Sequence, residues 1–512
     1  MSKQRNLNLA LLVALVPFAW LVSRFWWTCD DALISFRYAE HLAGGTGLIF
    51  NPGESPPVEG FSNLLWILLL APYQWMGFGL PSAANVISTA CGFGLISLVV
   101  RYVQLRFEAK MPVALAAGLF LACLPPFVIW STSGLETMPF ALAVFATFSA
   151  LTIDPEKPRP YLAGVFAIAA ALLRADGALW CGFAFLAVLP FWSRARFRAV
   201  LITGVLLTLA VALHFLWRHS YFGEWLPNTA KIKAGYTSLR GERGLRYLAS
   251  FLLAVPSIAL VLVLAPIATR SCKRAVPSAL IFVVASFGYA IYVGGDFMTM
   301  GRFVVPCLPF VALLFALICQ RLGGKVLSGV FTVSVLGLGL IACFDRLPVS
   351  AALRQEVHFR WNGPQARSEI EQWRFMDTQS RLWSDLGRAL ALHTQAGESL
   401  IRGNIGATGF YSELVLLDQN GLVIPKVAES SEPLKKASPG HDRRVEPSFF
   451  FDRNPTYFAA MLLPQRAPLP SGVPPSAIPL LRSGRLTQER YPLLEKDGFP
   501  LGSELRLLRF NY

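Results

Sequence analysis

Residues 9–39 read LALLVALVPFAWLVSRFWWTCDDALISFRYA, and this stretch decides the fold. Its first part, Leu9 to Trp27, is apolar over the length that a helix needs to cross a membrane. The run ends in Trp26-Trp27, a pair typical of the boundary between lipid and water. Asp30 and Asp31 follow directly, so the chain is expected to deliver two neighbouring carboxylates to a membrane surface.

The acid pair has a structural interpretation and a chemical one. Asp is a good N-cap residue, so Asp30 or Asp31 is expected to begin a short helix from 32 to 43, which Gly44-Gly45 would end. The other acid remains to be explained. A carboxylate at this boundary can deprotonate a hydroxyl, and a neighbouring like charge raises one pKa and keeps a usable base. We therefore predict a catalytic base here; the pair could also hold a divalent cation, although no cluster in the sequence requires one.

Composition indicates a polytopic membrane protein. Of the 512 residues, 54% are hydrophobic and 15% charged, and apolar runs of spanning length recur as far as Phe344. The net charge of +15 would suit nucleic acid or anionic lipid, but in such a protein Lys and Arg collect in cytoplasmic loops. We predict the lipid bilayer, and no nucleic acid, as a partner. Lys3 and Arg5 precede a run without an A-x-A site, which indicates an uncleaved first span.

The cysteines do not indicate a metal site or a disulfide framework. All eight precede residue 346, and most lie inside apolar runs without CxxC or metal-ligand spacing. They are expected to be buried small side chains. No Ser/His/Asp set, Walker loop or zinc pattern appears either, so no metal is predicted.

Basic clusters between the apolar runs give a topology. With each cluster placed in the cytoplasm, the chain forms about eleven membrane-spanning helices, and the C-terminal tail lies on the side opposite the N-terminus. The segment from Phe61 to Phe78 contains Pro72 and Gln74 and is expected to lie in the interface without crossing. The expected spans are 9–27, 83–105, 111–130, 136–153, 160–173, 177–193, 198–217, 247–268, 276–293, 302–320 and 326–344.

Polar motifs gather on one side of this topology. The internal loops hold only generic basic clusters, so the chemistry is expected on the external face, with residues 28–82 as a catalytic loop. The external ends receive the acid pair, Ser133 to Thr137, Arg174 to Gly177, Tyr221 to Lys233 and Gly294 to Arg302.

The tail after Arg346 is less apolar and richer in turn residues. We predict two domains, a transmembrane domain over 1–345 and an extracytoplasmic α/β domain over 346–512. The proline-rich segment 464–479 is expected to be a surface loop. A polar helical segment is expected at 364–394, followed by short apolar runs at 399–402, 414–418, 457–463 and 505–510.

Charged residues at external helix ends are candidates for binding an anionic donor. Arg37 shares a helix face with His41 and could grip a phosphate or face solvent. Glu136 and the Arg174/Asp176 pair lie at helix ends near the membrane, where ionisable groups are usually functional. Arg174 and Asp176 could also simply pair with each other.

The external loop 218–246 departs from the charge rule because it is basic. Its Lys and Arg residues around Asn228, among them Lys231, would suit a lipid phosphate, unless the loop is simply exposed. Asp296 follows two glycines, and Arg302 comes shortly after it. Like Arg174 and Asp176, they place an acidic and a basic side chain at one external helix end. The glycines would let the backbone approach a ligand closely.

Two motifs in the tail are candidates for acceptor binding. Asn404 lies in a glycine-rich stretch from Gly403 to Gly409, which weakly resembles a phosphate-binding loop but lacks the βαβ context. His441-Asp442 could bind an acceptor or form a turn, and nothing in the sequence decides between them.

Several motifs resemble those of one known family, in the same order and over nearly the whole chain. They are Asp30-Asp31-Ala-Leu-Ile-Ser-Phe-Arg-Tyr-Ala, Gly47-Leu-Ile-Phe-Asn-Pro-Gly, Val58-Glu-Gly-Phe-Ser-Asn, Gly134-Leu-Glu-Thr, Tyr221-Phe-Gly-Glu-Trp-Leu-Pro-Asn-Thr, Gly294-Gly-Asp-Phe-Met, Leu417-Asp-Gln-Asn-Gly-Leu422 and Pro439-Gly-His-Asp442. The family resembled is the GT-C-fold terminal β-(1→2) arabinofuranosyltransferases of mycobacteria and their broader bacterial relatives. Members are multi-span enzymes with an external soluble C-terminal domain. They take a sugar from a polyprenyl-phosphate donor, decaprenyl-phosphoryl arabinose in mycobacteria, and invert the anomeric centre.

The resemblance implies roles for particular residues. Asp30 or Asp31 would be the base and Glu136 a pocket residue, while the region from Asn228 to Lys231 and Arg302 would help to bind the donor phosphate. Two departures from the family pattern are present. Arg174-Ala-Asp176 stands where relatives often carry Arg-Pro-Glu, and the prolines of Ser55-Pro56-Pro57 lengthen the turn before Val58.

The resemblance thus implies an inverting glycosyltransferase of the bacterial inner membrane. It would move a sugar, with arabinofuranose as the best match, from a polyprenyl-phosphate donor to a glycan or glycoprotein acceptor on the outer face. A lipid flippase or transporter, the alternative from another class, would need polar residues along a midplane path and repeat-like halves, which are not evident. An envelope-assembly scaffold would leave the external acids dispensable.

Overall fold

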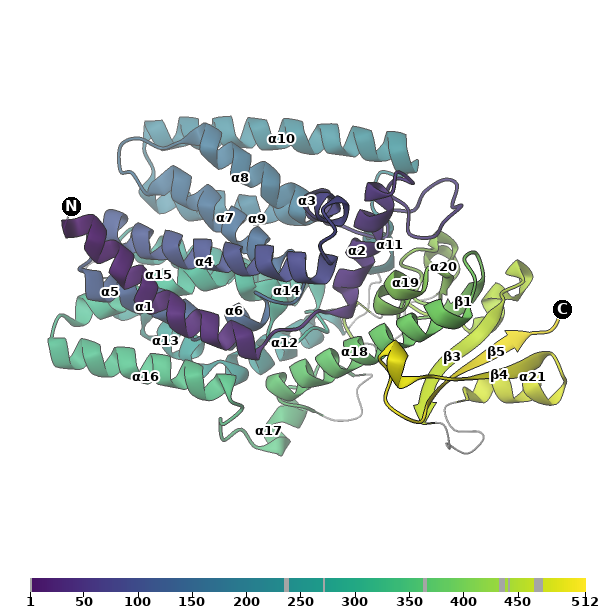
Figure 1. Cartoon of the computed structure of the whole chain (residues 1–512). Helices are drawn as coiled ribbons and strands as arrows, with labels where there is room; N and C mark the ends of the chain where they lie inside the picture. Colours follow the sequence, from purple (N-terminus) through teal and green to yellow (C-terminus); the bar gives the residue numbers. More distant parts are fainter. Residues whose placement is uncertain are drawn as a thin grey trace.

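The computed structural model describes residues 2–233, 239–269, 272–361, 366–431, 438–440, 443–464 and 473–512. Its helices lie side by side in a bundle, and a five-stranded sheet lies at one end of that bundle (Figure 1). Helix α2, Asp30–Ala43, stands across the junction between bundle and sheet. The junction is therefore where segments from both parts of the chain meet.

Among the described residues, five helices are long and apolar enough to cross a membrane, or six if one bent pair counts as a single span. They are α4 (Leu80–Arg106), α10 (Arg194–Phe222), α14 (Ala275–Val293), η2 with α15 (Arg302–Cys307 and Leu308–Leu322) and α16 (Lys325–Cys343). Shorter apolar helices are the Val13–Arg24 part of α1 (Ser2–Arg24), α3 (Leu64–Trp75), α5 (Met111–Ala122), α7 (Thr137–Thr152), α8 (Pro160–Leu173) and α9 (Gly177–Val188), the last continued by η1 (Leu189–Phe191). The chain is mostly helical and of membrane type, and the count of eleven spans stays a prediction.

The predicted span at 247–268 is not one straight helix. The chain forms two helices there, α12 (Arg240–Ala254) and α13 (Pro256–Thr269), which are bent by 97°. Pro256 has no N–H to continue the hydrogen bonding of α12. Its ring also pushes Val255 out of the helical region, to φ −133° and ψ 67°.

Two other predicted segments are shorter than expected. The span at 111–130 is divided into α5 and the short helix α6 (Pro125–Ile129), because consecutive prolines end the hydrogen bonding of the first helix. The interfacial segment at 61–78 contains α3, which is twelve residues long and carries Pro72 in its last turn.

Burial separates the centre of the bundle from its rim. In the span formed by η2 and α15, 89% of the apolar window is buried, against 17% in α10. Helix α15 is apolar around most of its circumference, so it packs against neighbours on every side. Phe310 of α15 stacks on Phe282 of α14 with ring centroids 3.8 Å apart. Helix α10 instead runs along the edge of the bundle (Figure 1).

The sheet has the strand order β2-β1-β3-β5-β4. β1 pairs in parallel with β2 and β3, and β5 pairs antiparallel with β3 and β4. Four strands occupy the predicted apolar runs, whereas β4 was not predicted because its sequence, LTQERYP, is mostly polar, as suits the edge of a sheet. The strands are β1 (Ser399–Arg402), β2 (Val415–Asp418), β3 (Tyr457–Pro464), β4 (Leu486–Pro492) and β5 (Ser503–Phe510).

Helix α18 (Glu369–His393) leads from the bundle to the sheet and confirms the predicted polar helix. It begins with a capping box formed by Ser368 and Glu371. Of the predicted loop at 464–479, residues 465–472 lie outside the described residues, while residues 475–479 are helical and not an irregular loop. The remaining helices are α11 (Asn228–Lys233), α17 (Ala351–Glu356), α19 (Gly406–Ser412), α20 (Pro425–Ser430) and α21 (Ile478–Arg482), with the 3-10 turns η3 (Pro447–Arg453), η4 (Pro475–Ala477) and η5 (Glu495–Asp497).

Buried hydrogen bonds fix the sheet region on α2 and on the loop after it. Arg37 of α2 donates to the carbonyl oxygens of Gly409 and Leu414, at 2.7 and 2.8 Å. The amide of Asn51 bonds both the N–H and the carbonyl of Leu416, at 2.9 and 3.1 Å. These contacts satisfy backbone groups that would otherwise be buried without partners.

The start of α2 differs from the expectation that one acid caps it. Its N-cap is Cys29, and no side chain provides a cap hydrogen bond. Asp30 and Asp31 both lie in the first turn, where negative charge faces the positive end of the helix dipole. Both carboxylates are therefore available for contacts outside their own helix.

Candidate active site

A pocket of about 250 Å³ lies at the junction between the bundle and the sheet region. Its walls come from the first turns of α2, the loop before α3, the turns before α7 and α9, the start of α11, helix α14, the start of η2 and the loop after β2. Polar lining residues are Asp31, Ser35, Ser62, Asn63, Glu136, Arg174, Asp176, Thr229, Tyr289 and Arg302. The pocket thus collects charged groups that are far apart in the sequence.

The two acids of α2 point to different places. Asp31 lines the pocket together with Ile34 and Ser35, which lie three and four residues further along the same helix face. Within the described part of the chain, the Asp31 carboxylate forms no hydrogen bond or ion pair, whereas the pocket acids Glu136 and Asp176 both do. Asp31 is therefore the acid in this pocket that is free to accept a proton.

Asp30 faces the sheet region instead. Its Oδ1 accepts a hydrogen bond of 2.7 Å from the backbone N–H of Ala407, in the first turn of α19. Burial raises the pKa of Asp30 to about 7, against the lowering effect of this bond; the charge of Asp31 raises it further and that of Arg402 lowers it. The predicted rise of one pKa therefore falls on Asp30, and desolvation contributes more to it than the like charge.

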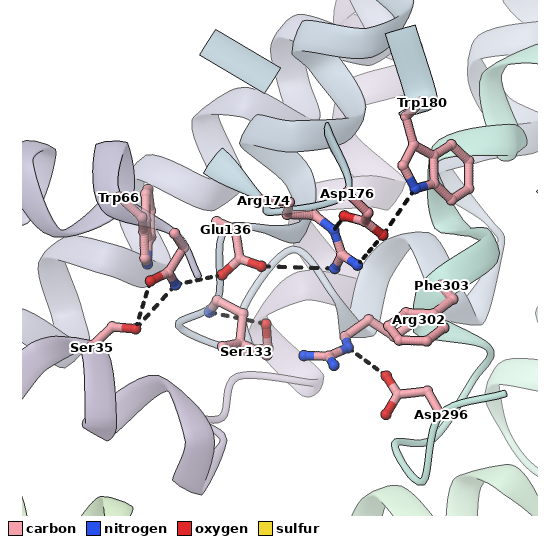
Figure 2. Close-up of polar contacts among 12 residues, drawn as sticks. Ser35, Trp66, Ser133, Glu136, Arg174, Asp176, Trp180, Asp296, Arg302 and Phe303 are labelled. Carbon is pink, nitrogen blue, oxygen red and sulfur yellow. Dashed lines mark hydrogen bonds and ion pairs between the residues drawn. The ribbon is translucent and has the colours of Figure 1, made fainter. Parts of the chain in front are cut away.

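Arg174 stands at the centre of a buried ion-pair cluster (Figure 2). Its guanidinium makes two hydrogen bonds to Asp176, at 2.8 and 2.9 Å, and lies 3.9 Å from Glu136. Asp176 also accepts from Tyr289 at 2.9 Å and from Trp180 at 3.2 Å. Burial alone would raise the pKa of Asp176, but the charge and hydrogen bonds of Arg174 outweigh it and hold that pKa below its ordinary value.

A second set of contacts links α2 to the turn before α7. Asn63 donates to Ser35 at 3.0 Å and to Glu136 at 2.9 Å. The turn is held close to α2 by Gly134, whose φ is +78° and whose added Cβ would lie 3.0 Å from Ala32. Asn63 thereby bridges the helix that carries Asp31 and the cluster around Arg174.

Arg302 closes another side of the pocket. It is paired with Asp296 at 2.6 Å, and its guanidinium lies 5.8 Å from the ring centre of Trp130. Asp296 itself lines an adjoining cavity of about 240 Å³, which also contains Arg240 and Arg243. The two cavities share residues Ala230, Tyr289 and Phe303, so they form neighbouring chambers of one region.

Five of the residues predicted from the sequence meet in the first pocket. They are Asp31, Glu136, Arg174, Asp176 and Arg302. Asp296 lies in the adjoining cavity and pairs with Arg302, in agreement with the predicted pattern of an acid and a base at one boundary. The proposed roles of these residues stay predictions.

Other predicted donor-binding residues lie outside the pocket. Arg37 is buried with its guanidinium held by two backbone carbonyls, so it fixes the sheet region and is not placed to grip a phosphate. Asn228 donates to the carbonyls of Gly421 and Leu422, and Lys231 pairs with Glu224 at 2.7 Å.

Of the predicted acceptor-binding residues, the structure describes Asn404. The carbonyl of Asn404 accepts from Arg402 at 3.2 Å in the loop before α19, on the Asp30 side of α2. His441 and Asp442 lie outside the described residues.

Several pocket residues were not indicated by the sequence. Asn63 ends the Val58 to Asn63 motif, and only that motif could have drawn attention to it. Tyr289 lies inside an apolar span, where a single hydroxyl gives no signal of its partner. Leu422 belongs to the loop after β2 and comes from the tail, which the sequence assigned to a separate domain.

The described residues contain no group of three or more His, Cys, Asp and Glu side chains placed to hold a metal ion. Asp30 and Asp31 cannot act together as the predicted cation ligands, because Asp30 is turned toward Ala407 and Asp31 toward the pocket. The residues present therefore do not fit a divalent cation at the acid pair.

The fold is that of the GT-C class of membrane proteins. The chain superposes on ArnT from Cupriavidus metallidurans, solved with undecaprenyl phosphate bound, with a TM-score of 0.57, 12% identity and coverage of 98% of this chain and 97% of ArnT. The structure of ArnT in the apo state gives a TM-score of 0.55.

The resemblance predicted from the sequence motifs is confirmed by two curated proteins named terminal beta-(1->2)-arabinofuranosyltransferase. The protein of Mycobacterium tuberculosis is 28% identical over 336 residues, which are 57% of this chain and 53% of that protein. The protein of Corynebacterium glutamicum is 26% identical over 340 residues, which are 56% of this chain and 47% of that protein. The chain thus spans about half the length of the curated relatives that it matches. No family model matches the chain.

Proposed function

We propose that this chain is an inverting glycosyltransferase of the bacterial inner membrane. It would move a sugar, best matched by arabinofuranose, from a polyprenyl-phosphate donor to a cell-envelope glycan or glycoprotein on the outer face. The likeness to named arabinofuranosyltransferases and the fold shared with a protein that binds undecaprenyl phosphate both support this proposal.

The proposal depends mainly on the unpaired carboxylate of Asp31. Its carboxylate lines the junction pocket and, among the described residues, is bound by no other side chain or backbone group. Every other acid at or beside this pocket is already hydrogen-bonded, as Glu136 is to Asn63 and Asp296 is to Arg302. A general base must have a free lone pair within reach of the proton that it removes.

The arginines around the pocket support an anionic donor. Arg174 and Arg302 are each neutralised in part by an aspartate, so they form a polar wall with little net charge. The adjoining cavity is lined by Arg240 and Arg243 together with Asp296, so its lining has one more basic than acidic side chain. We assign the donor phosphate to the boundary between the two cavities, beside Arg302, and the sugar to the Asp31 side.

The reaction then follows as a single displacement. Asp31 takes the proton of the acceptor hydroxyl while the hydroxyl oxygen bonds to the anomeric carbon, opposite the phosphate. The bond from that carbon to the phosphate oxygen breaks, and its electron pair leaves with the phosphate, whose charge the arginines stabilise. One free carboxylate suits inversion, by analogy with glycosidases, in which retention needs a second carboxylate as the nucleophile.

The test is transfer of labelled sugar by purified protein from a panel of polyprenyl-phosphate sugars. We expect Asp31→Asn to lower turnover by about 10²–10⁴-fold, the usual contribution of a general base. Asp452→Asn, which changes an exposed acid of the sheet region, is the matched control and should transfer at the wild-type rate. Wild-type turnover in the Asp31→Asn variant, or movement of the lipid-linked sugar across the membrane without covalent product, would contradict the proposal.

A further inference from the structure

A second cavity, of about 380 Å³, lies on the other side of α2 from the candidate active site. We call it the α18 groove. Its walls are the segment between α1 and α2, the side of α2 that carries Leu33, the start of α4, and helices α18 and α19. None of the residues that line it lines the Asp31 pocket, so the groove is a separate site.

The charged wall of the groove has equal numbers of acidic and basic side chains. Helix α18 presents Asp377, Arg381, Asp385 and Arg388, which recur every three or four residues and so share one face. They form two ion pairs, Arg381 with Asp377 at 3.0 Å and Arg388 with Asp385 at 2.8 Å. With two charges of each sign, this wall suits an uncharged ligand better than an anionic headgroup or nucleic acid.

These ion pairs are available to a ligand. The side chain of Arg381 is 68% exposed, and those of Arg388 and Asp385 are 51% and 45% exposed. Exposed pairs of this kind contribute only about 0–1 kcal/mol to stability, so their carboxylates and guanidinium groups can exchange partners at little cost. Together they offer planar donors and acceptors in alternation, which is the pattern needed to bind several hydroxyl groups.

Aromatic rings also line the groove. Trp26, in the segment between α1 and α2, leaves 41% of its surface exposed. Tyr411 of α19 lies under the guanidinium of Arg388, 4.5 Å from its charged carbon. A sugar ring has an apolar C–H face that packs on such a ring, and hydroxyl groups at its edge that need the polar wall. An acyl chain would match only the aromatic side.

We infer that the α18 groove binds the acceptor glycan at units remote from the one that receives the sugar. The inference rests on the proposed transferase function and narrows its acceptor from glycan or glycoprotein to an oligosaccharide. Helix α2 is the partition between the two sites, and its width of roughly 10–12 Å means that a short acceptor can occupy only one of them.

The test measures binding of arabinofuranosyl oligosaccharides of two and six units to purified full-length protein without donor, by calorimetry. The wild type is expected to bind the six-unit chain more tightly. Trp26→Ala and Arg381→Ala are each expected to weaken that binding by about tenfold, a change of about 1.4 kcal/mol.

Controls separate the groove from general effects. Trp192→Ala removes another tryptophan that is 53% exposed but lies outside the groove, and it should leave the six-unit affinity unchanged. Melting temperatures of the variants within a few degrees of the wild type exclude misfolding. Glycerophosphoglycerol, a soluble lipid headgroup, should not compete; competition by it would overturn the inference in favour of a lipid site.

Transfer assays distinguish failure of this inference from failure of the proposed function. In the groove variants we expect KM for the six-unit acceptor to rise about tenfold, with kcat and all two-unit kinetics unchanged. Equal wild-type affinity for the two chain lengths, or unchanged six-unit binding in both variants, would overturn the inference even if transfer occurs. A third outcome is that the six-unit chain binds more tightly than the two-unit chain and the variants weaken this binding, but the wild type transfers no sugar. The groove would then be a glycan site, and the transferase function would be rejected.

Discussion

Asp30 and Asp31 are neighbours in the sequence, yet their surroundings differ. A helix places successive side chains about 100° apart, so one carboxylate turns toward Ala407 and the other toward the pocket. The sequence predicted a base within this pair but left both acids as candidates. The choice depends on which face of α2 meets the sheet region, and that contact joins residues 377 positions apart.

The pKa of Asp30 gives a prediction for stability against pH. Its value is about 7 in the folded protein and 3.8 as the ordinary value. Between these values the folded protein holds a proton that the unfolded chain has released, so raising the pH over this window favours unfolding, and above pH 7 the contribution is constant. Asp30→Asn removes the titrating group, while its amide oxygen can still accept the Ala407 N–H.

We therefore expect the variant to gain stability relative to the wild type as the pH rises from 4 to 7, at no more than ~1.4 kcal/mol per pH unit. The measurement is the melting temperature of both proteins in detergent between pH 4 and 8. Asp452→Asn is the control and should follow the wild-type curve. Parallel curves for Asp30→Asn and the wild type would show that Asp30 is not the buried acid described here.

At the scale of elements, the contact between α2 and α19 joins the two halves of the chain. An added Cβ at Gly406 would lie 2.0 Å from the backbone oxygen of Asp30 and 2.9 Å from its carboxyl carbon. Only glycine allows this approach, because backbone cannot move aside as the end of a flexible side chain can. The glycine-rich stretch that the sequence assigned to a ligand thus makes room for α2.

Gly406→Ala should therefore separate the two helices. We expect it to cost about 1–3 kcal/mol of stability through overpacking, and to lower sugar transfer at least tenfold, since Asp31 would move with the first turn of α2. Gly182→Ala is the matched control: its added Cβ meets no atom within 4 Å, inside helix α9, and alanine is the better helix former. Wild-type transfer by Gly406→Ala would show that α19 does not position Asp31.

The sequence predicted helices and strands well where one local pattern, such as an apolar run, determines the element. Apolar runs gave most membrane-type helices, and the strands at 399–402 and 415–418 agree with their short apolar runs. The patterns failed where a single proline decides between a straight helix and a bend, as at Pro256. They also failed at β4, whose polar residues are stabilised by pairing with β5 and give no apolar signal of their own.

At the scale of the whole molecule, the site exists only because distant segments converge. Charged residues before α7, α9 and η2 were recognisable as candidates, since ionisable groups are unusual near apolar spans. Their pairing was not recognisable: the partners of Arg174 and Arg302 depend on the packing of whole helices. The contribution of Leu422 required knowledge of how the sheet region docks.

The proposed mechanism also requires one particular orientation of the molecule in the membrane. The positive-inside rule places the Lys157/Arg159 turn in the cytoplasm. Helix α2, whose first turn carries Asp31, and the sheet lie at one end of the bundle (Figure 1). A donor phosphate and an envelope acceptor can meet Asp31 only if that end is external.

Single cysteines at exposed positions test this orientation. Leu501 precedes strand β5, and its side chain is 85% exposed. Glu156 lies in the exposed turn between α7 and α8. Each is replaced by cysteine in a separate variant. We expect a membrane-impermeant maleimide to label Leu501→Cys in intact spheroplasts, and Glu156→Cys only after permeabilisation. Of the native cysteines, six are buried and two are half-buried, so the wild type gives the background. The reverse pattern would place Asp31 on the cytoplasmic side, where it could not serve an envelope acceptor.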